Sequence, residues 1–307
     1  MRTIVVGLGV QGKKRLIHAG DDLVATVDPH LRNASFKSIE QVPPDSYDCA
    51  LVATPDEAKY KIIEYLIGQR KHFLVEKPLY LDSPSLYSEM EQKARAHGVF
   101  AYTAYNHRFE PNFAKMRQSL RSNLVGKIYS CRIFYGNGTA KLVRESPWRD
   151  CSTGVLQDLG SHLLDTLDFW FGRGYISQGV TTLATHENAA PDHAVTSFKM
   201  NEILINLEMS LCSWKNTFEC DVVGSAGSLH IRGLCKWGIS EFIYRTRRVP
   251  AGVPEEKIHS EAQGDPTWQL EYFFFTNQIK TGATTDLSKD AWISSNLDYL
   301  YRAGQKL

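Results

Sequence analysis

A lysine and an acid–histidine pair are the residues of this 307-residue sequence best suited to chemistry. Lys77 lies in the segment VEKPL, and Asp158 and His162 lie four residues apart in DLGSHLLD. Residues four apart share one helix face. A histidine can take the proton of a hydroxyl group near neutral pH, and a lysine ammonium can stabilise the negative charge that builds on the same oxygen. The pattern therefore suits proton transfer at a hydroxyl group. Taken alone, each part also fits a plainer interpretation, a surface lysine before a helix and a helix with a solvated polar face.

A glycine-rich turn near the start of the chain is typical of dinucleotide binding. In VVGLGVQGKKRL, three glycines connect a predicted strand at 2–7 to a predicted helix at 10–19. Gly7 would allow the tight turn, Gly9 would let the backbone approach a pyrophosphate, and Gly12 would let the helix pack closely on the strand. The N–H groups at the helix start would hold the phosphates. The alternative is an ordinary turn between a strand and a helix.

An aspartate at the end of the second predicted strand supports the nucleotide interpretation. Asp28 follows Gly7 by 21 residues and closes the segment 22–28. A carboxylate there would accept hydrogen bonds from the ribose hydroxyls and would repel a 2′-phosphate. The sequence therefore predicts NAD as the cofactor, with NADP less favoured. Arg32 weakens this preference, because a nearby arginine can accommodate the phosphate.

Two kinds of sequence texture predict two domains. Up to about residue 120, predicted strands alternate with predicted helices, which is typical of a parallel sheet covered on both faces. Beyond it, strands separated by short connections predict a mixed, largely antiparallel sheet, interrupted by one helix at 154–172. We therefore expect an α/β dinucleotide-binding Rossmann domain at 1–120 and a substrate-binding and oligomerisation domain at 121–307.

Composition excludes several classes of protein. The formal net charge is +1, so no broad attraction to nucleic acid or to a membrane surface is expected. No apolar stretch approaches the ~18 residues of a membrane span. Six scattered cysteines without a CxxC pair or a His–Cys cluster predict reduced thiols in a cytoplasmic protein and no metal site.

Seven segments in one order give the chain a family resemblance. They are GLGVQG, ATPDE, VEKPL, YNHRFEP, VGKI, SPWRD and DLGSHLLD. With them the chain resembles the glucose–fructose oxidoreductase, inositol dehydrogenase and rhizopine-catabolism (Gfo/Idh/MocA) family. The resemblance implies an NAD(P)-dependent oxidoreductase acting on a CH–OH group of a sugar, a cyclitol or a nucleotide sugar. It also implies a cis peptide bond between Lys77 and Pro78.

The resemblance assigns roles residue by residue. It implies that Lys77, Asp158 and His162 are catalytic and also bind substrate. Other substrate contacts would come from the family-matching loops, at Asn106, Arg108, Trp148 and Arg149. The cofactor contacts it implies are Gly7, Gly9, Val10, Gln11, Gly12, Asp28, Thr54, Pro55, Glu76 and Lys77.

The sequence departs from the family pattern in two places. Lys59 stands where the family often has a histidine, and the glycine-rich run before DLG is reduced to STGVLQ at 152–157. The first change would alter the cofactor edge and the second the substrate pocket. Two other functions remain open: a non-catalytic sensor of NAD or sugar, and an oxidoreductase for a tetrapyrrole such as biliverdin or for a dihydrodiol.

The strand set between 180 and 245 also bears on assembly. Few helices are left to cover its second face. An exposed sheet face of that size would be an apolar patch larger than monomers usually tolerate. We therefore expect a homodimer or homotetramer formed through this face.

Overall fold

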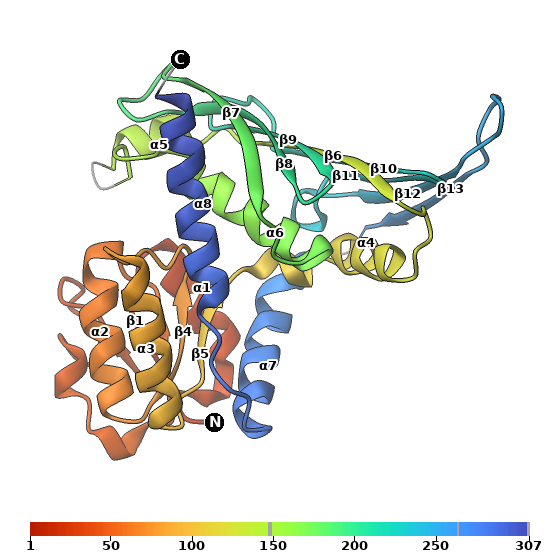
Figure 1. Ribbon diagram of the computed structural model, residues 1–307. Helices are drawn as coiled ribbons and strands as arrows, with labels where there is room; N and C mark the ends of the chain where they lie inside the picture. The colour runs from red at the N-terminus through yellow and green to blue at the C-terminus, as the bar shows by residue number, and fades with distance from the viewer. Residues whose placement is uncertain (147–148, 263, 306–307) are drawn as a thin grey trace. The chain divides into compact units, whose positions relative to one another are not determined.

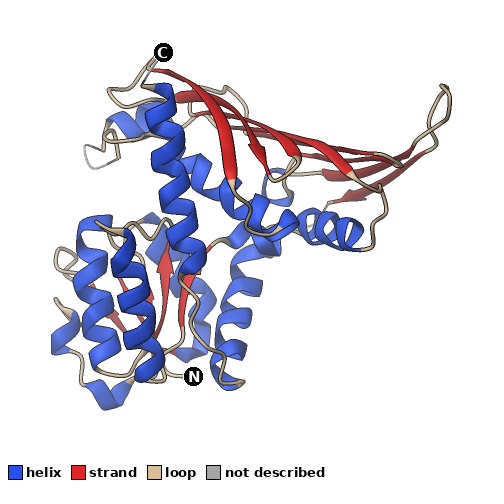
Figure 2. Cartoon of the chain, viewed as in Figure 1, coloured by secondary structure: helices blue, strands red, loops and turns tan. Residues whose placement is uncertain are grey.

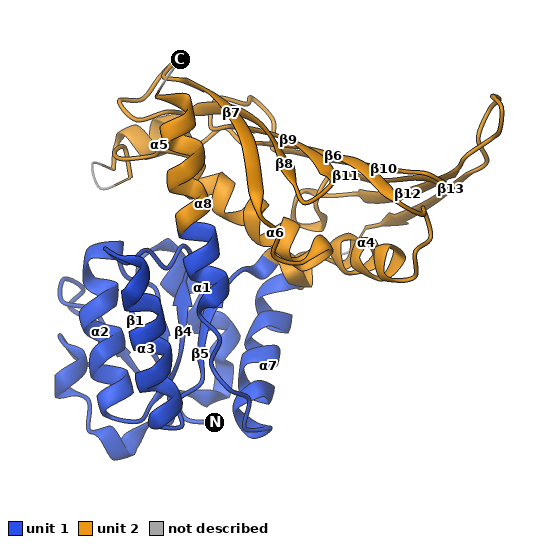
Figure 3. Cartoon of the chain, viewed as in Figure 1, with its two compact units in different colours: residues 1–106, 267–294 blue, residues 107–266, 295–307 orange. Residues whose placement is uncertain are grey.

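The computed structural model describes residues 1–146, 149–262 and 264–305 and divides the chain into two compact units (Figure 3). Unit 1 comprises Met1–Asn106 and Thr267–Ser294, and unit 2 comprises His107–Pro266 and Ser295–Leu307. These bounds differ from the expected ranges 1–120 and 121–307. The first boundary falls earlier because the helix Pro111–Arg121 belongs to unit 2. A late segment also returns to unit 1, and the order of elements along the chain does not indicate such a return.

Unit 1 is built on a parallel sheet (Figure 1). Its strand order is β2-β1-β3-β4-β5. The strands are β1 (Thr3–Val6), β2 (Leu23–Val27), β3 (Cys49–Val52), β4 (His72–Glu76) and β5 (Ala101–Ala104). Every residue of β1 and β3 is buried, as expected for central strands with both sheet faces covered. The predicted dinucleotide-binding architecture is confirmed.

Helices cover both faces of this sheet. The helices assigned wholly to unit 1 are α1 (Val10–Ala19), α2 (Asp56–Gly68), α3 (Pro84–Ala96) and α7 (Thr267–Lys280). Ile63 of α2 and Met90 of α3 join one apolar core with alternate strand residues such as Val6. Tyr272 and Phe275 of α7 join the core on the opposite face. The late helix α7 therefore completes the first unit.

Unit 2 is built on an eight-stranded sheet with the order β13-β12-β11-β10-β6-β9-β8-β7. The strands are β6 (Ile128–Gly136), β7 (Ile176–Ala184), β8 (His193–Met200), β9 (Ile203–Ser210), β10 (Thr217–Gly224), β11 (Gly227–Arg232), β12 (Ser240–Thr246) and β13 (Glu256–Glu261). Strands β6 and β9 pair in parallel, and the other neighbours pair antiparallel. The mixed, largely antiparallel sheet is thus confirmed.

The helical segment expected at 154–172 differs from one continuous α-helix. A π-helical turn at Leu156–Gly160 leads into α6 (Ser161–Phe171). A second, short helix, α5 (Ala140–Arg144), also interrupts the strands. Five residues are too few to display a helical period, so the sequence pattern could not indicate α5. Helix α4 (Pro111–Arg121) belongs to unit 2, and α8 (Ser288–Gly304) contributes residues to both units.

The second face of the unit 2 sheet is not the apolar patch that was expected. Alternate residues point to it, and its central hollow is lined by Arg132, Asp221, His230 and Arg232, among other residues. Asp221 accepts hydrogen bonds from all three of the basic side chains. Exposed apolar residues such as Leu204 occur on the same face, so the surface is mixed. Alternation revealed which positions would face outward but not that charge would gather at this point.

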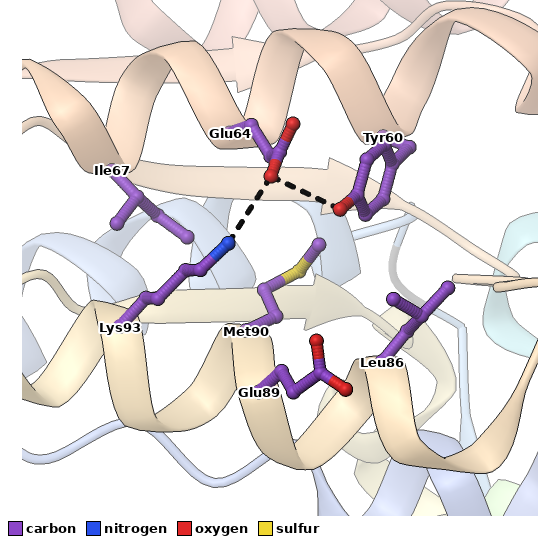
Figure 4. Close-up of a pocket in the computed structure, with 7 residues that line it drawn as sticks. All are labelled: Tyr60, Glu64, Ile67, Leu86, Glu89, Met90 and Lys93. Atoms are coloured by element: carbon purple, nitrogen blue, oxygen red, sulfur yellow. Dashed lines mark hydrogen bonds and ion pairs between the residues drawn. The ribbon is translucent and has the colours of Figure 1, made fainter.

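A shallow recess lies between α2 and α3 in unit 1 (Figure 4). Glu64 accepts a hydrogen bond from Tyr60 at 3.0 Å and from Lys93 at 3.3 Å. Tyr60, Glu64 and Lys93 are therefore hydrogen-bonded to one another. The recess contains none of the predicted site residues. Figure 2 shows the helices of the chain, and in the described ranges none is both long and apolar enough to cross a membrane.

Candidate active site

The glycine turn of unit 1 has the geometry that its sequence predicts. Gly7 has φ +87°, and a Cβ there would lie 2.5 Å from the carbonyl oxygen of Ala53. A Cβ on Gly12 would lie 1.8 Å from the carbonyl oxygen of Gly7, so only glycine allows helix α1 to approach β1 this closely. Gly9 caps the N-terminus of α1 and has open space where its Cβ would be. Val10 and Gln11 follow it, exposed in the first turn.

Asp28 lies directly after β2 and is tied to the glycine turn. Its Oδ2 accepts the backbone N–H of Leu8 at 2.9 Å, and its Oδ1 accepts those of His30 and Leu31 at 2.9 and 3.0 Å. Burial acts to raise the pKa of Asp28, but these three donors outweigh it and lower the pKa. The side chain is therefore a fixed anion. Two carboxylate oxygens offer about four acceptor sites, which leaves room for a ribose hydroxyl.

The residues after β3 add a polar group that fits a nucleotide. Thr54 and Pro55 follow this strand at the carboxyl edge of the sheet, where ligands bind in open α/β sheets. The Oγ1 atom of Thr54 is buried and has no hydrogen-bond partner in the structure. Together with the open space at Gly9, this hydroxyl makes the edge suitable for NAD.

Lys77 directly follows β4 and is partly exposed. The peptide bond from Lys77 to Pro78 is cis, as the family resemblance implies. The carboxylate of Glu76 accepts a hydrogen bond from the buried Arg15 at 2.7 Å, so this predicted cofactor residue has an internal partner. Lys77 thus follows directly after a residue, Glu76, whose side chain is held by a buried hydrogen bond.

Asp158 and His162 lie on the two sides of the junction between the π turn and α6. Asp158 belongs to the π turn and accepts a hydrogen bond from Arg149 at 3.1 Å. His162 is in the first turn of α6 and is 9% exposed. Leu163, the next residue, is fully buried. Single π turns of this kind occur frequently at functional sites.

A stack of aromatic side chains holds the ring of His162. Its ring centroid is 4.2 Å from that of His107, with an interplanar angle of 20°, and 6.3 Å from that of Tyr135. The Nζ atom of Lys236 lies 3.4 Å from Nε2 of His107 and 4.8 Å from the Trp237 ring centroid. Burial lowers the pKa of Lys236, although several acidic groups, Asp265 foremost, oppose the shift. The rings of His107 and Tyr135 therefore flank the predicted catalytic histidine, and the Lys236 cation lies beside His107.

A buried pair connects the two loops that supply His107 and Lys236. Glu110 accepts the backbone N–H of Cys235 at 3.1 Å and its thiol at 2.8 Å. Burial raises the pKa of Glu110, and burial together with this carboxylate raises that of Cys235. The raised pKa of Cys235 keeps its thiol protonated, so that it donates to Glu110. The pair fixes Lys236 next to a segment 129 positions away in the sequence.

The predicted substrate contacts have varied surroundings. Asn106 belongs to unit 1 and donates a hydrogen bond to Thr267 at 2.9 Å. Arg108 donates to Asp165 at 2.9 Å and to Asp168 at 2.5 Å, so its guanidinium ties the loop to α6. Trp148 lies outside the described residues.

Sequence reasoning missed the group formed by His107, Tyr135, Lys236 and Trp237. His107 stands in the family-matching segment YNHRFEP, which was a usable signal. Nothing in the sequence around Lys236 indicates that it reaches this histidine, because the contact depends on the folding of β11 and its following loop.

Two family models match the chain. One, described as an oxidoreductase family with an NAD-binding Rossmann fold, matches residues 1–105. The other, the Gfo/Idh/MocA C-terminal domain, matches residues 113–230. The chain belongs to the Gfo/Idh/MocA oxidoreductase family. Its first unit is accordingly an NAD-binding Rossmann domain.

Two curated relatives of the chain are named dehydrogenases. Glucose-6-phosphate 3-dehydrogenase of Bacillus subtilis is 25% identical over 229 residues, which are 66% of this chain and 65% of the relative. The match thus spans just under two thirds of that relative's length. Inositol 2-dehydrogenase 4 of Saccharopolyspora erythraea is 22% identical over 255 residues, 76% of this chain and 74% of the relative.

A solved structure of another protein has the same fold over almost the entire chain. Levoglucosan dehydrogenase in complex with NADH superposes with a TM-score of 0.83 at 15% identity, covering 99% of this chain and 96% of that structure. At this identity the likeness establishes the fold and does not identify a substrate.

Proposed function

We propose that this Gfo/Idh/MocA protein is an NAD-dependent dehydrogenase that transfers a hydride between nicotinamide and a secondary hydroxyl or ketone of a sugar, a cyclitol or a nucleotide sugar. The observation that carries the proposal is the buried, aromatically stacked imidazole of His162 in a chain that also has an NAD-binding turn. The names of the two curated relatives support the substrate class. We further propose a cytoplasmic location, because cysteines that form no disulfide are typical of a reducing compartment.

His162 is the proposed acid–base group. Its stack on His107 limits rotation of the ring, which would keep a ring nitrogen directed at the substrate hydroxyl. Removing or returning that proton is the step general acid–base catalysis supplies. The cofactor, when bound, supplies the hydride chemistry itself.

Lys77 is the proposed electrostatic partner on the same substrate oxygen. Its ammonium would donate a hydrogen bond to the oxygen and stabilise negative charge there. Asp158 would bind an adjacent hydroxyl, with Arg149 holding its carboxylate in place.

Lys236 and Trp237 extend the proposed substrate pocket. An ammonium donates hydrogen bonds to hydroxyl oxygens, and the flat face of a tryptophan suits the apolar face of a sugar ring. We expect these residues to affect KM for the substrate more than NAD affinity.

Activity screening tests the proposal. The full chain is incubated with NAD⁺ and a panel of sugars, sugar phosphates, cyclitols and nucleotide sugars, and NADH absorbance is followed. The same panel is screened by thermal shift with NAD present, where a ligand at 100 times its Kd adds about 2.7 kcal/mol. Turnover of at least one panel member is expected. Binding without turnover would favour the sensor function, and neither binding nor turnover would favour a non-sugar substrate.

Variants at the two proposed catalytic residues sharpen the test. Lys77→Ala and His162→Asn should each lower kcat at least ~100-fold, while the Kd for NADH stays nearly constant. Their combined loss should be less than multiplicative, because the groups act as one unit. His259→Asn, at an exposed position of β13, is the control and should retain activity. Near-normal turnover by a folded His162→Asn variant would remove this histidine from the mechanism.

A further inference from the structure

A buried lysine in unit 1 lies next to the segment that carries Lys77. Lys59 is on α2, within its first turn, and is 2% exposed. Burial lowers the pKa of Lys59, and the Asp56 carboxylate opposes that shift. A buried ammonium is costly unless hydrogen bonds and an opposite charge compensate it, so its partners indicate what it holds in place.

The three partners of Lys59 form a specific set. Its Nζ donates to the carbonyl oxygens of Glu76 and Pro78 at 2.7 and 2.8 Å. The same atom lies 2.6 Å from Oδ1 of Asp56. An ammonium has three N–H donors, which matches these three acceptors. The two carbonyls belong to the residues immediately before and after Lys77.

A second buried cation restrains the same segment from another helix. Arg15 of α1 is 1% exposed, and its Nε donates to the Glu76 carboxylate at 2.7 Å. Its Nη2 lies 2.7 Å from Glu271 of α7, and its guanidinium stacks over the Trp268 ring at 4.4 Å. Arg15 thus holds the Glu76 side chain, whereas Lys59 holds the backbone on both sides of Lys77.

We propose that Lys59 is a positioning residue that fixes the direction in which Lys77 extends. The proposal rests on the function proposed above for Lys77. Misplacing a catalytic group by about 1 Å can cost roughly 100-fold in rate. Loss of the two hydrogen bonds that hold the flanking carbonyls should therefore lower kcat. A neutral histidine, which the family pattern would place here, has one N–H donor and could not make all three contacts. This set of three contacts therefore depends on the lysine that this chain has at position 59.

A purely structural lysine would behave differently in a double-mutant cycle. If Lys59 acts through Lys77, its replacement loses its effect once Lys77 is gone. If Lys59 only stabilises the Rossmann unit, its replacement lowers activity equally in both backgrounds and weakens NAD binding.

The experiment uses the full chain, NAD⁺ and the panel compound that the protein turns over fastest. Lys59→Met should lower kcat ~10- to 100-fold with less than a ~2-fold change in the KM for NAD⁺. In the Lys77→Ala background the same substitution should change kcat less than ~2-fold. Lys61→Met, at an exposed position of the same helix, is the matched control and should match the unmodified protein.

A second variant protects the test against misfolding. Lys59→Gln retains two N–H donors for the two carbonyls and should give a smaller loss of kcat than Lys59→Met. Equal losses of kcat with and without Lys77, an unchanged kcat in folded Lys59→Met, or a loss in Lys59→Gln as large as that in Lys59→Met would overturn the positioning role. A normal kcat in Lys77→Ala, or no turnover of any panel compound, would instead refute the proposed function, and the inference with it.

Discussion

The Asp28 carboxylate is expected to set the preference for NAD over NADP. It is a buried anion fixed by three backbone N–H groups, so it can repel a 2′-phosphate without moving away. Asp28→Asn keeps one side-chain oxygen as an acceptor and removes the negative charge. It should therefore bring the dissociation constant for NADPH closer to that for NADH, as measured by fluorescence titration. Asp28→Ala should have the same effect, at a larger cost in stability because three donors lose their acceptor. Tighter binding of NADPH than NADH by the unmodified chain would contradict the prediction.

Glu271 makes the stability of unit 1 depend on pH. Burial raises the pKa of this carboxyl to about 7, although Arg15 opposes the shift. Between about pH 4.5 and 7 the folded state holds a proton that the unfolded chain has lost, so the free energy of unfolding falls as the pH rises, by about 3 kcal/mol in total. Glu271→Gln removes this titration, and Glu76 still leaves Arg15 an anionic partner.

Thermal unfolding at several pH values measures the effect. The Tm of Glu271→Gln minus the Tm of the unmodified chain should be larger at pH 8 than at pH 5. Parallel pH profiles of the two proteins would show that Glu271 does not titrate in this range.

The residues predictable from sequence were those whose role depends on local backbone. Gly7, Gly12 and Asp28 are positioned by one strand–turn–helix unit and the strand after it, so spacing sufficed to predict their geometry. Lys236 reaches His107 only because of the path of the loop after β11. Arg108 donates hydrogen bonds to carboxylates of α6. Those contacts depend on tertiary packing, which the sequence pattern did not encode.

At the scale of elements, the turn between β1 and α1 contains two glycines with different expected roles. Gly12 allows close packing of the helix on the strand, and Gly9 leaves space for the cofactor. A Cβ at Gly12 would meet the Gly7 carbonyl, whereas a Cβ at Gly9 would meet nothing in the structure. Gly12→Ala should therefore lower the Tm and weaken NADH binding together. Gly9→Ala should leave the Tm within a degree or two but weaken NADH binding, because the methyl group would occupy the approach of the pyrophosphate.

Melting curves and NADH titrations of the two variants check this pair. An unchanged Kd for NADH in Gly9→Ala would mean that the cofactor does not approach this turn. An unchanged Tm in Gly12→Ala would mean that α1 can shift away from β1 without cost.

Element order was predictable from sequence, but assignment to a unit was not. The alternating pattern of β1 to β5 and their helices was readable because each element has its own period. Helix α7 has the same kind of apolar face as a helix of the second unit would have, yet Tyr272 and Phe275 complete the core of the first. A long return of the chain costs little loop entropy, so nothing local distinguishes the two outcomes.

At the scale of the whole molecule, we expect a homodimer or homotetramer formed through the open face of the unit 2 sheet. The face is more charged than the sequence suggested, but interfaces as a whole are only about as apolar as other protein surface, and arginine is enriched in them. Arg132, Arg232 and Asp221 lie beside exposed apolar side chains such as Leu204, which is 58% exposed. A second copy would cover both kinds of group at once.

Light scattering tests the assembly at micromolar concentration. The monomer has a mass of 34.7 kDa, and a mass of two or four times this value is expected. Leu204→Glu places a charge on the face and should lower the mass toward that of the monomer, whereas Ile17→Glu, at an exposed position of α1, should not. Because charged groups contribute to the proposed contact, high salt should weaken it further in the Leu204→Glu variant. A monomeric mass for the unmodified chain would show that this sheet face remains open to solvent.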